Sequence, residues 1–520
     1  MKKTRFTSFV FGPLAGVFLV IAANAFVAHP AKADTAPVFT SGPTVSTVAD
    51  TVADISFTAD SFAADQNGTY YLYYTDETFS EVDTSEEVRD SSQQTGIFST
   101  GSEAVAALTD LSANMAYYVK VVLEDSEGVL QEKPATIILE TLEPYVLFAP
   151  MATPDAYLID MDGGIRNTWQ LTDLTTSVYL LEDNQLLAPY HVPSQYFQEG
   201  DAWVGGGIEI LDWCGNRVYS YELKDNPRYH LHHDIERMQN GNILATAYER
   251  ITRQDAIDLG FDESYINEYG EVWSDAVFEI DLETGEIVWE WHVKDHLLRS
   301  GSESSDYPGL INPAYPLTLN STDWLHINAI DYNEALKQII LSVRNFKEIW
   351  IINHALTESE ARGHLGDLLF RFGNPEAYGE SGDAEFDRGQ HDVHWIDPNS
   401  ATSNILLYNN KDEYHDGTDT STVVELKVDT PYEFGSATIV WEYGDDTGEE
   451  KFYSNVVSSV QRLPTGGNLI CSGADAEMME IDENGNKVWE YVNTEYGAAF
   501  PDGSFVTHVF RAKKYYLDLE

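Results

Sequence analysis

The chain has 520 residues, which is enough for more than one domain and a large core. Hydrophobic residues make up 43% of the sequence, which excludes a disordered chain, and aromatic residues make up 12%, which favours β-structure. The 86 acidic residues against 30 Lys and Arg residues give a net charge of −56, so nucleic acids and anionic membranes are not expected partners.

The N-terminus has the pattern of an export signal. A basic start over residues 2–5 precedes an apolar stretch over residues 6–28, and a small-x-small cleavage sequence follows at residues 31–33. We therefore expect residues 1–33 to be a signal peptide, and the mature protein to be periplasmic or secreted with no membrane attachment after cleavage. A retained N-terminal anchor is the alternative.

Residues 35–143 predict a β-sandwich. Short strands of alternating pattern, such as those at residues 53–57 and 70–74, are separated by polar turns. The segment LTDLSANMAYYVKVVLEDSEG resembles a fibronectin type III domain, in which a Leu precedes a Tyr that forms a tyrosine corner. That resemblance gives these two roles to Leu111 and Tyr117.

From residue 145 to residue 520 the chain repeats a unit of two hairpins. The first hairpin is an apolar strand, a turn of Asp, Asn or Gly, and a strand ending in Trp or Tyr, as in VFEIDLETGEIVWEW and MMEIDENGNKVWEY. A second strand–turn–strand segment follows each one, as in HHDIERMQNGNILATAYE and the closing GAAFPDGSFVTHVF. The pairs predict an all-β fold, a six-bladed β-propeller preceded by the fibronectin type III-like sandwich.

Several first hairpins end on a strand with a Trp, and we expect these Trp residues to pack between blades. They are Trp289, Trp441 and Trp489. Long insertions at residues 254–273 and 296–323 interrupt the period, and we expect them to line one face of the propeller, with a short helix near the first. The two cysteines fall in different repeats, so we expect them not to pair.

Histidines open the second segment in three successive repeats. They are His230, His232 and His233 in one repeat, His326 in the next, and His391 and His394 in the third. Equivalent positions in adjacent blades point toward the mouth of the central channel, so we expect one cluster there. Because neighbouring residues of a strand point to opposite faces, only one of His232 and His233 is expected to reach it.

Other polar residues accompany the histidines. Asn328 lies two residues after His326, so strand alternation predicts that both share a face. Arg344 ends the next strand, and its planar guanidinium suits an oxyanion, with a salt bridge at a blade edge as the alternative. Asn409 and Asn410 end the strand after the third histidine pair, where ordinary turn chemistry also explains them.

Two chemistries suit such a cluster. A neutral imidazole can attack an electrophile and carry it covalently, while a second histidine moves the proton and Arg or Asn neutralises the developing charge. Alternatively, His233, His326 and His391 bind a metal ion that activates water, as in a hydrolase or lyase. The residues alone leave both chemistries open, together with a non-catalytic binding propeller.

The motifs HHDIERMQNGNIL, DWLHINAIDY with ILSVRN, and GQHDVHWI with ILLYNN resemble the bacterial arylsulfate sulfotransferase family, which does not use an adenylyl-sulfate cofactor. Their order and spacing match over the whole propeller, and the closing HVFRAKKYY is also similar. The resemblance implies an exported propeller enzyme that moves a sulfuryl group from a small-molecule aryl sulfate donor to a phenolic acceptor. It implies a ping-pong route through a sulfated histidine, with no cofactor and no metal.

The resemblance also implies roles for individual residues. His391 of the QH motif is the expected nucleophile, and His233 of the HHD motif is expected to bind or polarise the sulfate. His326 is the expected acid and base, Asn328 a sulfate ligand, and Arg344 the cation that clamps the sulfate.

The sequence departs from the family in three places. Better-known members have Thr after the QH motif, whereas this chain has Asp392 and then His394, so His394 is the alternative nucleophile. We expect His394 and Asn409 to contact substrate. The family's close cysteine pair is absent, and the N-terminal domain is of another type, so a homodimer stays open but is not expected to form through that domain.

Overall fold

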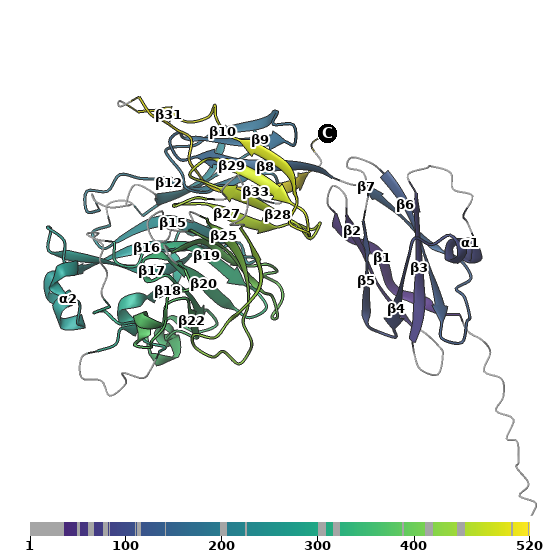
Figure 1. Cartoon of the computed structure of the whole chain (residues 1–520), viewed down its shortest axis with the longest axis horizontal. Helices are drawn as coiled ribbons and strands as arrows, with labels where there is room; N and C mark the ends of the chain where they lie inside the picture. Colours follow the sequence, from purple (N-terminus) through teal and green to yellow (C-terminus); the bar gives the residue numbers. More distant parts are fainter. Residues whose placement is uncertain are drawn as a thin grey trace, which may run out of the picture. The chain divides into compact units, whose positions relative to one another are not determined.

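The computed structural model shows two units, divided near residue 140 (Figure 1). The signal peptide expected at residues 1–33 lies outside the described residues. These are residues 36–48, 52–60, 67–75, 82, 84–109, 111, 116–140, 142–181, 183–197, 205–223, 226–299, 308–315, 323–386, 389–410, 420–444, 453–500, 503–517 and 519.

The first unit is a sandwich of two antiparallel sheets. One sheet has the order β1–β2–β5 and the other β4–β3–β6–β7. The strands are β1 (Val38–Val48), β2 (Ala53–Asp60), β3 (Asn67–Thr75), β4 (Gln94–Ser99), β5 (Glu103–Leu108), β6 (Ala116–Asp125) and β7 (Ala135–Glu140), with the helix α1 (Ser85–Asp90). Phe57 of β2 and Tyr70 of β3 pack edge to face, with ring centroids 5.4 Å apart. The fibronectin type III assignment, with Leu111 and Tyr117 at its corner, stays a prediction.

The second unit contains six four-stranded antiparallel sheets within the described residues. Five of them use four consecutive strands each. They are β11 (Tyr179–Leu180), β12 (Leu186–His191), β13 (Gly206–Leu211) and β14 (Arg217–Glu222); β15 (Tyr229–Arg237), β16 (Ile243–Thr252), β17 (Glu271–Ile280) and β18 (Ile287–His292); β19 (Ile327–Asn333), β20 (Gln338–Val343), β21 (Glu348–Asn353) and β22 (Phe370–Phe372); β23 (Gln390–Trp395), β24 (Ile405–Asn409), β25 (Thr422–Lys427) and β26 (Thr438–Tyr443); β27 (Ser459–Arg462), β28 (Asn468–Ser472), β29 (Glu477–Ile481) and β30 (Lys487–Val492).

The sixth sheet joins the two ends of the unit. Its order is β10 (Ile165–Gln170), β9 (Asp155–Asp160), β8 (Glu143–Pro150) and β33 (Val509–Leu517), so the last strand of the chain pairs with the first strand of the unit. The closing segment GAAFPDGSFVTHVF was expected to be an ordinary second hairpin. Instead β31 (Ala498–Ala499) and β32 (Phe505–Val506) form a small sheet of their own.

Buried apolar clusters connect each sheet of the second unit to its two neighbours. Ile208 of β13 and Leu231 of β15 share one cluster, and Ile351 of β21 and Leu407 of β24 share another. A further cluster joins the sheet β27–β30 to β8 and β33, which returns the packing to its starting point. Because every sheet packs on two others, the sheets form the ring of a β-propeller, and the predicted all-β propeller is confirmed.

The repeated tryptophans connect neighbouring sheets, as predicted. Trp289 of β18 donates its indole N–H to the carbonyl of Leu356 in the next sheet's outer turn at 3.0 Å. Trp489 of β30 donates in the same way to Met161, between β9 and β10, at 2.7 Å. Trp441 lies under the guanidinium of Arg462, which belongs to the following sheet, at 5.7 Å. The outer hairpins therefore lock each blade to the next.

The first insertion contains the expected short helix, α2 (Arg253–Leu259), which ends at Gly260 in the left-handed region at φ 97°. A second short helix, α3 (Glu358–Ala361), follows β21. Cys214 is exposed and Cys471 is buried, and they are not paired. No helix within the described part of the chain is both long and apolar enough to cross a membrane.

Candidate active site

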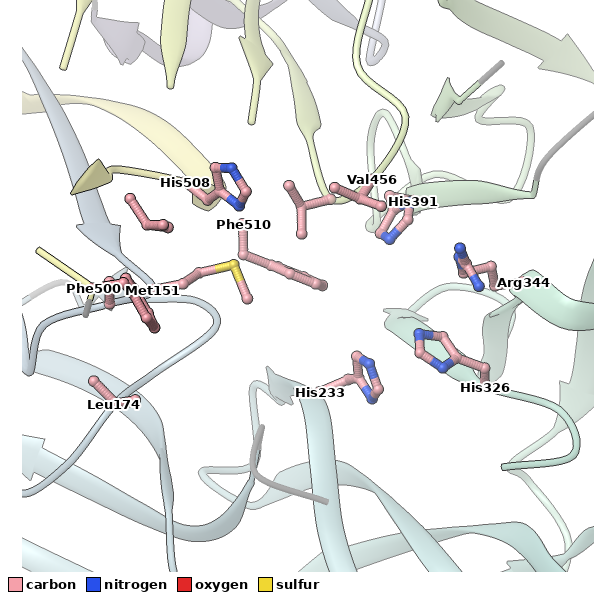
Figure 2. Close-up of a pocket in the computed structure, with 13 residues that line it drawn as sticks. Met151, Leu174, His233, His326, Arg344, His391, Val456, Phe500, His508 and Phe510 are labelled. Carbon is pink, nitrogen blue, oxygen red and sulfur yellow. The ribbon is translucent and has the colours of Figure 1, made fainter. Parts of the chain in front are cut away.

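Three of the predicted histidines and the predicted arginine line one pocket of about 570 Å³ (Figure 2). They are His233, His326, Arg344 and His391. His233 and His391 lie on β15 and β23, the first strands of two sheets, and His326 directly precedes β19, the first strand of the sheet between them. The closing strand β33 contributes the apolar Phe510. The remaining lining residues among those described are Met151, Ala152, Leu174, Val456, Val457, Phe500, Val506, His508 and Phe510. The described lining contains no carboxylate, although the whole protein is strongly acidic.

The backbone breaks its regular pattern at each of these histidines. His233 and His326 have φ values of 52° and 56°, and Asp392, which directly follows His391, has φ 54°. The pairing register of the three first strands shifts at the same places, between Leu231 and Ile235, Ile327 and Ala329, and His391 and His394. Bulges of this kind redirect side chains, and left-handed residues other than Gly concentrate at functional sites.

His391 is held by an amide whose own orientation is fixed. Asn410 donates its Nδ2 to the carbonyls of Ser454 and Val457 at 2.9 and 3.1 Å, so its Oδ1 is turned toward His391 Nδ1 at 2.6 Å. Since this oxygen can only accept, the hydrogen-bond pattern assigns the proton of the neutral ring to Nδ1 and leaves a lone pair on Nε2. Burial and the charge of Arg344 hold the pKa of His391 well below its ordinary value of 6.5.

His326 forms a dyad with a buried carboxylate. Its Nδ1 lies 2.5 Å from Asp323 Oδ2, and Asp323 also accepts from the hydroxyl of Tyr248 at 3.0 Å. Burial by itself would raise the pKa of Asp323, but the adjacent His326 ring outweighs it, and the pKa lies below its ordinary value. An ionised Asp323 accepts from Nδ1 of His326 and so fixes the orientation of the ring.

His233 lies against His326, with ring centroids 4.4 Å apart. Its Nδ1 is 2.8 Å from Nδ1 of His232, which does not line the pocket and whose Nε2 is 2.9 Å from Asp275. Of the two adjacent histidines, His233 lines the pocket and His232 contacts it from behind. Burial, then the neighbouring His326, holds the pKa of His233 well below its ordinary value, so this ring is neutral.

Arg344 begins a 3₁₀ turn, η4 (Arg344–Phe346), directly after β20. Its Nη1 donates to Asn345 Oδ1 at 3.3 Å, and the Asn345 amide donates to the carbonyl of Asp323 at 2.9 Å. Gly389 has φ 98°, and a Cβ there would lie 2.6 Å from Arg344 Cγ. The Gly before the QH motif is thus required both by its backbone conformation and by the close approach of Arg344.

Three predicted site residues do not line this pocket: Asn328, His394 and Asn409. Asn328 is buried and donates to the carbonyl of Gln390 at 2.9 Å, because the register shift in β19 turns it away from the face of His326. His394 Nδ1 lies 2.7 Å from the carbonyl of Asp392, and Asn409 donates to Thr422 Oγ1 at 3.3 Å. Their substrate contacts stay predictions.

The residues that orient the histidines were not identified from the sequence. Asp323 lies three residues before His326, a spacing that could have been noticed. Asn410 was seen beside Asn409 and explained as turn chemistry, yet it is Asn410 whose amide contacts His391. Arg511 lies in the closing HVFRAKKYY motif, but nothing in that motif shows that it pairs with Asp234 and Asp392.

The donor set of the pocket bears on the metal alternative. Within the described parts of the chain, no three or more His, Cys, Asp or Glu residues are grouped so that they could hold a metal ion. The pocket brings together three histidines, one of them paired with a buried carboxylate, and one arginine around one space.

Comparison with known proteins identifies a family. The model of the Arylsulfotransferase (ASST) family matches residues 139–500. No curated protein matches the chain significantly.

Solved structures with a likeness include a streptogramin B lyase (11% identity, 72% of this chain and 90% of that chain, TM-score 0.35). They also include the periplasmic gluconolactonase PpgL of Pseudomonas aeruginosa (10% identity, 71% and 99%, TM-score 0.36) and a calcium-binding regucalcin of Agrobacterium tumefaciens (11% identity, 64% and 85%, TM-score 0.30). These TM-scores are too low for the likenesses to support any conclusion.

Proposed function

This chain belongs to the arylsulfotransferase family and is a sulfotransferase enzyme, and we propose that it works by a ping-pong route through a sulfated His391. The observation that carries the proposal is the fixed amide of Asn410, which leaves His391 Nε2 with a lone pair in the pocket. A neutral imidazole held in this way is an activated nucleophile that needs no prior loss of a proton.

The groups around His391 suit a sulfate ester. The sulfuryl group carries its charge on non-bridging oxygens, which the guanidinium of Arg344 can bind through its planar donors. The neutral His233 supports the same group without repelling the approach of the nucleophile. Because no carboxylate lies in the described lining, nothing there repels the anionic donor.

The acid–base dyad completes the first half-reaction. His391 Nε2 forms the N–S bond while the S–O bond to the aryl oxygen breaks, and His326 gives its proton to the departing oxygen. In the second half-reaction an acceptor phenol gives its proton to His326 as its oxygen forms the new S–O bond. The N–S bond then breaks, and both histidines return to their starting states.

The apolar side of the pocket is suited to the aryl groups. Phe510, Met151, Leu174 and Phe500 line it opposite the polar cluster (Figure 2). Apolar lining with a few convergent polar groups is typical of small-molecule sites. We therefore propose that the substrates are an aryl sulfate donor and a phenolic acceptor.

We also propose a location outside the cytoplasm for the mature protein. The support is the basic, apolar and small-residue pattern of residues 1–33. A homodimer stays a prediction.

The test is rapid mixing of purified protein with 4-nitrophenyl sulfate, with and without phenol. We expect a burst of 4-nitrophenol equal to the enzyme concentration, and steady release that phenol accelerates. His391→Ala should abolish both, while the exposed His364→Ala should behave as wild type. A burst that survives His391→Ala but is lost in His394→Ala would show that His394 is the nucleophile. Phenol-dependent release with no burst would contradict the covalent route.

A further inference from the structure

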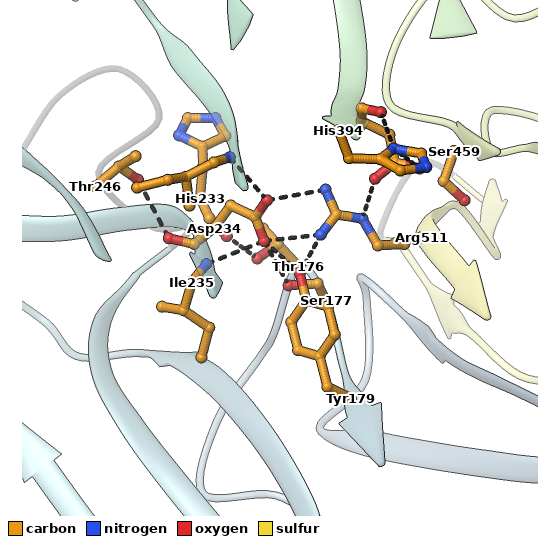
Figure 3. Close-up of polar contacts among 12 residues, drawn as sticks. Thr176, Ser177, Tyr179, His233, Asp234, Ile235, Thr246, His394, Ser459 and Arg511 are labelled. Atoms are coloured by element: carbon orange, nitrogen blue, oxygen red, sulfur yellow. Dashed lines mark hydrogen bonds and ion pairs between the residues drawn. The ribbon is translucent and has the colours of Figure 1, made fainter. Parts of the chain in front are cut away.

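A second polar cluster, outside the pocket lining, is centred on Arg511 of the closing strand β33 (Figure 3). Its Nη1 and Nη2 atoms donate to the two carboxylate oxygens of Asp234, both at 2.9 Å. Its Nε lies 2.8 Å from Asp392 Oδ1. Asp234 directly follows His233, and Asp392 directly follows His391, so one guanidinium connects the backbones of two pocket histidines.

These histidines come from sheets that are not neighbours, because β15 and β23 are separated by the sheet that begins with β19. Direct pairing of the strands therefore cannot set the distance between His233 and His391. Arg511 spans the gap, and β33 belongs to a third sheet. The guanidinium thus joins three of the six sheets at one point.

The cluster is buried and its charges are paired, with Arg511 Nε joined to Asp392 as an ion pair rather than by a hydrogen bond. The side chains of Asp234 and Arg511 are 0% and 5% exposed. Asp234 also accepts from the hydroxyl of Tyr179 and from the backbone N–H of Ile330, at 3.2 Å for the latter. Asp392 accepts from the backbone N–H of Val460 at 2.9 Å. Buried charges with this many partners hold a defined geometry, whereas removing one partner leaves an uncompensated charge.

The residue before Arg511 contacts the same histidines from the pocket side. The Phe510 ring centroid lies 5.8 Å from that of His391 and 6.3 Å from that of His233. Two consecutive residues of β33 therefore act on both histidines. Phe510 contacts the rings, and Arg511 pairs with the carboxylates of the residues that follow them. Both lie beyond residue 500, where the family match ends.

We propose that Arg511 and Phe510 are positioning residues, which set the separation and aim of His233 and His391 and so make catalysis depend on closure of the propeller by the last strand. This inference rests on the proposed function. The left-handed conformations of His233 and Asp392 are sparsely populated and persist only where surrounding structure enforces them. The pairing of Arg511 with Asp234 and Asp392 supplies that enforcement at both bulges.

The test is the first-turnover burst with Arg511→Lys. Lysine keeps the charge, but its single ammonium cannot bond both oxygens of Asp234 and also reach Asp392 in the same geometry. We expect the burst rate constant to fall about 10- to 100-fold, as loss of alignment does, while the burst amplitude stays equal to the folded enzyme. Partial unfolding would lower the amplitude and leave the rate constant unchanged.

Arg371→Lys is the matched control. Arg371 is fully buried and bonds both oxygens of Glu348, with Nε at 2.9 Å and Nη2 at 2.5 Å, and it does not line the pocket. The Arg371→Lys variant should lower Tm as Arg511→Lys does, yet keep the burst rate constant within about twofold of the wild-type value. An equal fall in rate for both variants would show a general effect of buried ion pairs and overturn the proposal.

If Arg511→Lys does not fold, Asp392→Asn tests the same positioning role. Asn tolerates the left-handed backbone and keeps the size of Asp, but it removes the charge opposite Arg511. We expect a slower burst of full amplitude, and an unchanged rate constant would overturn the proposal. Absence of a burst in wild-type protein would instead refute the sulfohistidine route. The role of Arg511 would then be tested by steady-state kinetics, in which a positioning residue lowers kcat more than it raises KM.

Discussion

The outer and inner strand pairs of the blades use the same device with different residues. In both, the pairing register shifts by a bulge, as between Glu279 and Ile280 on the outside and between His391 and His394 on the inside. On the outside the left-handed residue lies in the hairpin turn before the bulge and is Gly, such as Gly285 at φ 71°. On the inside the left-handed residue lies at or beside the bulge itself and is His233, His326 or Asp392.

The difference separates structural from functional positions. Glycine adopts the left-handed conformation without steric cost, so the outer turns are unstrained. The same conformation costs other residues about 1–2 kcal/mol each. The inner bulges are thus maintained by the contacts around them, and their effect is to turn histidines into one pocket.

The largest effect is expected from removing the positive charge of Arg344 in the inner region. Arg344→Gln keeps the length of a polar side chain but removes the charge that faces the sulfuryl oxygens. We expect kcat/KM for 4-nitrophenyl sulfate to fall about 10²- to 10³-fold, as when one oxyanion donor is lost. Steady-state kinetics would check this, and a loss below tenfold with unchanged folding would place the anion elsewhere in the pocket.

A smaller effect is expected from the amide that orients the nucleophile. Asn410→Leu removes the acceptor for His391 Nδ1, so the ring can rotate and present either tautomer. We expect the burst rate constant to fall about 10- to 100-fold. Asn409→Leu, on the adjacent residue that bonds Thr422, is the matched comparison and should change the rate far less. The reverse ranking would contradict the assignment of the proton to Nδ1.

The pH dependence tests the electrostatics of the same histidine. Attack requires neutral His391, whose pKa is lowered by burial and by Arg344, so the burst should persist as pH falls through the ordinary histidine range. Protonation should stop it only at lower pH. In Arg344→Gln the pKa rises because a positive charge is removed, and the acid limb should move to higher pH. An acid limb that stays in place would show that another group controls it.

The smallest effect on activity is expected in the outer region. Gly285→Ala places a Cβ where the nearest atom, on Tyr221, is 4.0 Å away, so its cost comes from the backbone alone. We expect a loss of about 1 kcal/mol in the free energy of unfolding and unchanged kcat. Urea denaturation and steady-state kinetics would check both parts, and a loss of kcat would show that the outer turns also shape the pocket.

Much of the site could be predicted because its residues sit at equivalent places in a repeated pattern. His233, His326, Arg344 and His391 were all identified from the sequence, and the structure brings them to one pocket. Asn328 does not line the pocket, because strand alternation assumes a regular register and the bulge at the start of β19 breaks it. Asn410, beside the predicted Asn409, contacts His391, since the direction of a residue at the end of a strand depends on its neighbours.

The sequence by itself determined the all-β architecture, the repeats and the types of reactive side chain, because hydrophobic alternation and turn residues act over short distances. Only the tertiary structure decided which residues hold those side chains. Asn410, Asp323 and Arg511 act through contacts that follow from ring closure and from bulges, and Arg511 lies 277 residues from Asp234 along the chain. The sequence shows the residues that make such contacts but not their pairing, because the pairing depends on buried charges and hydrogen bonds that exist only in the folded propeller.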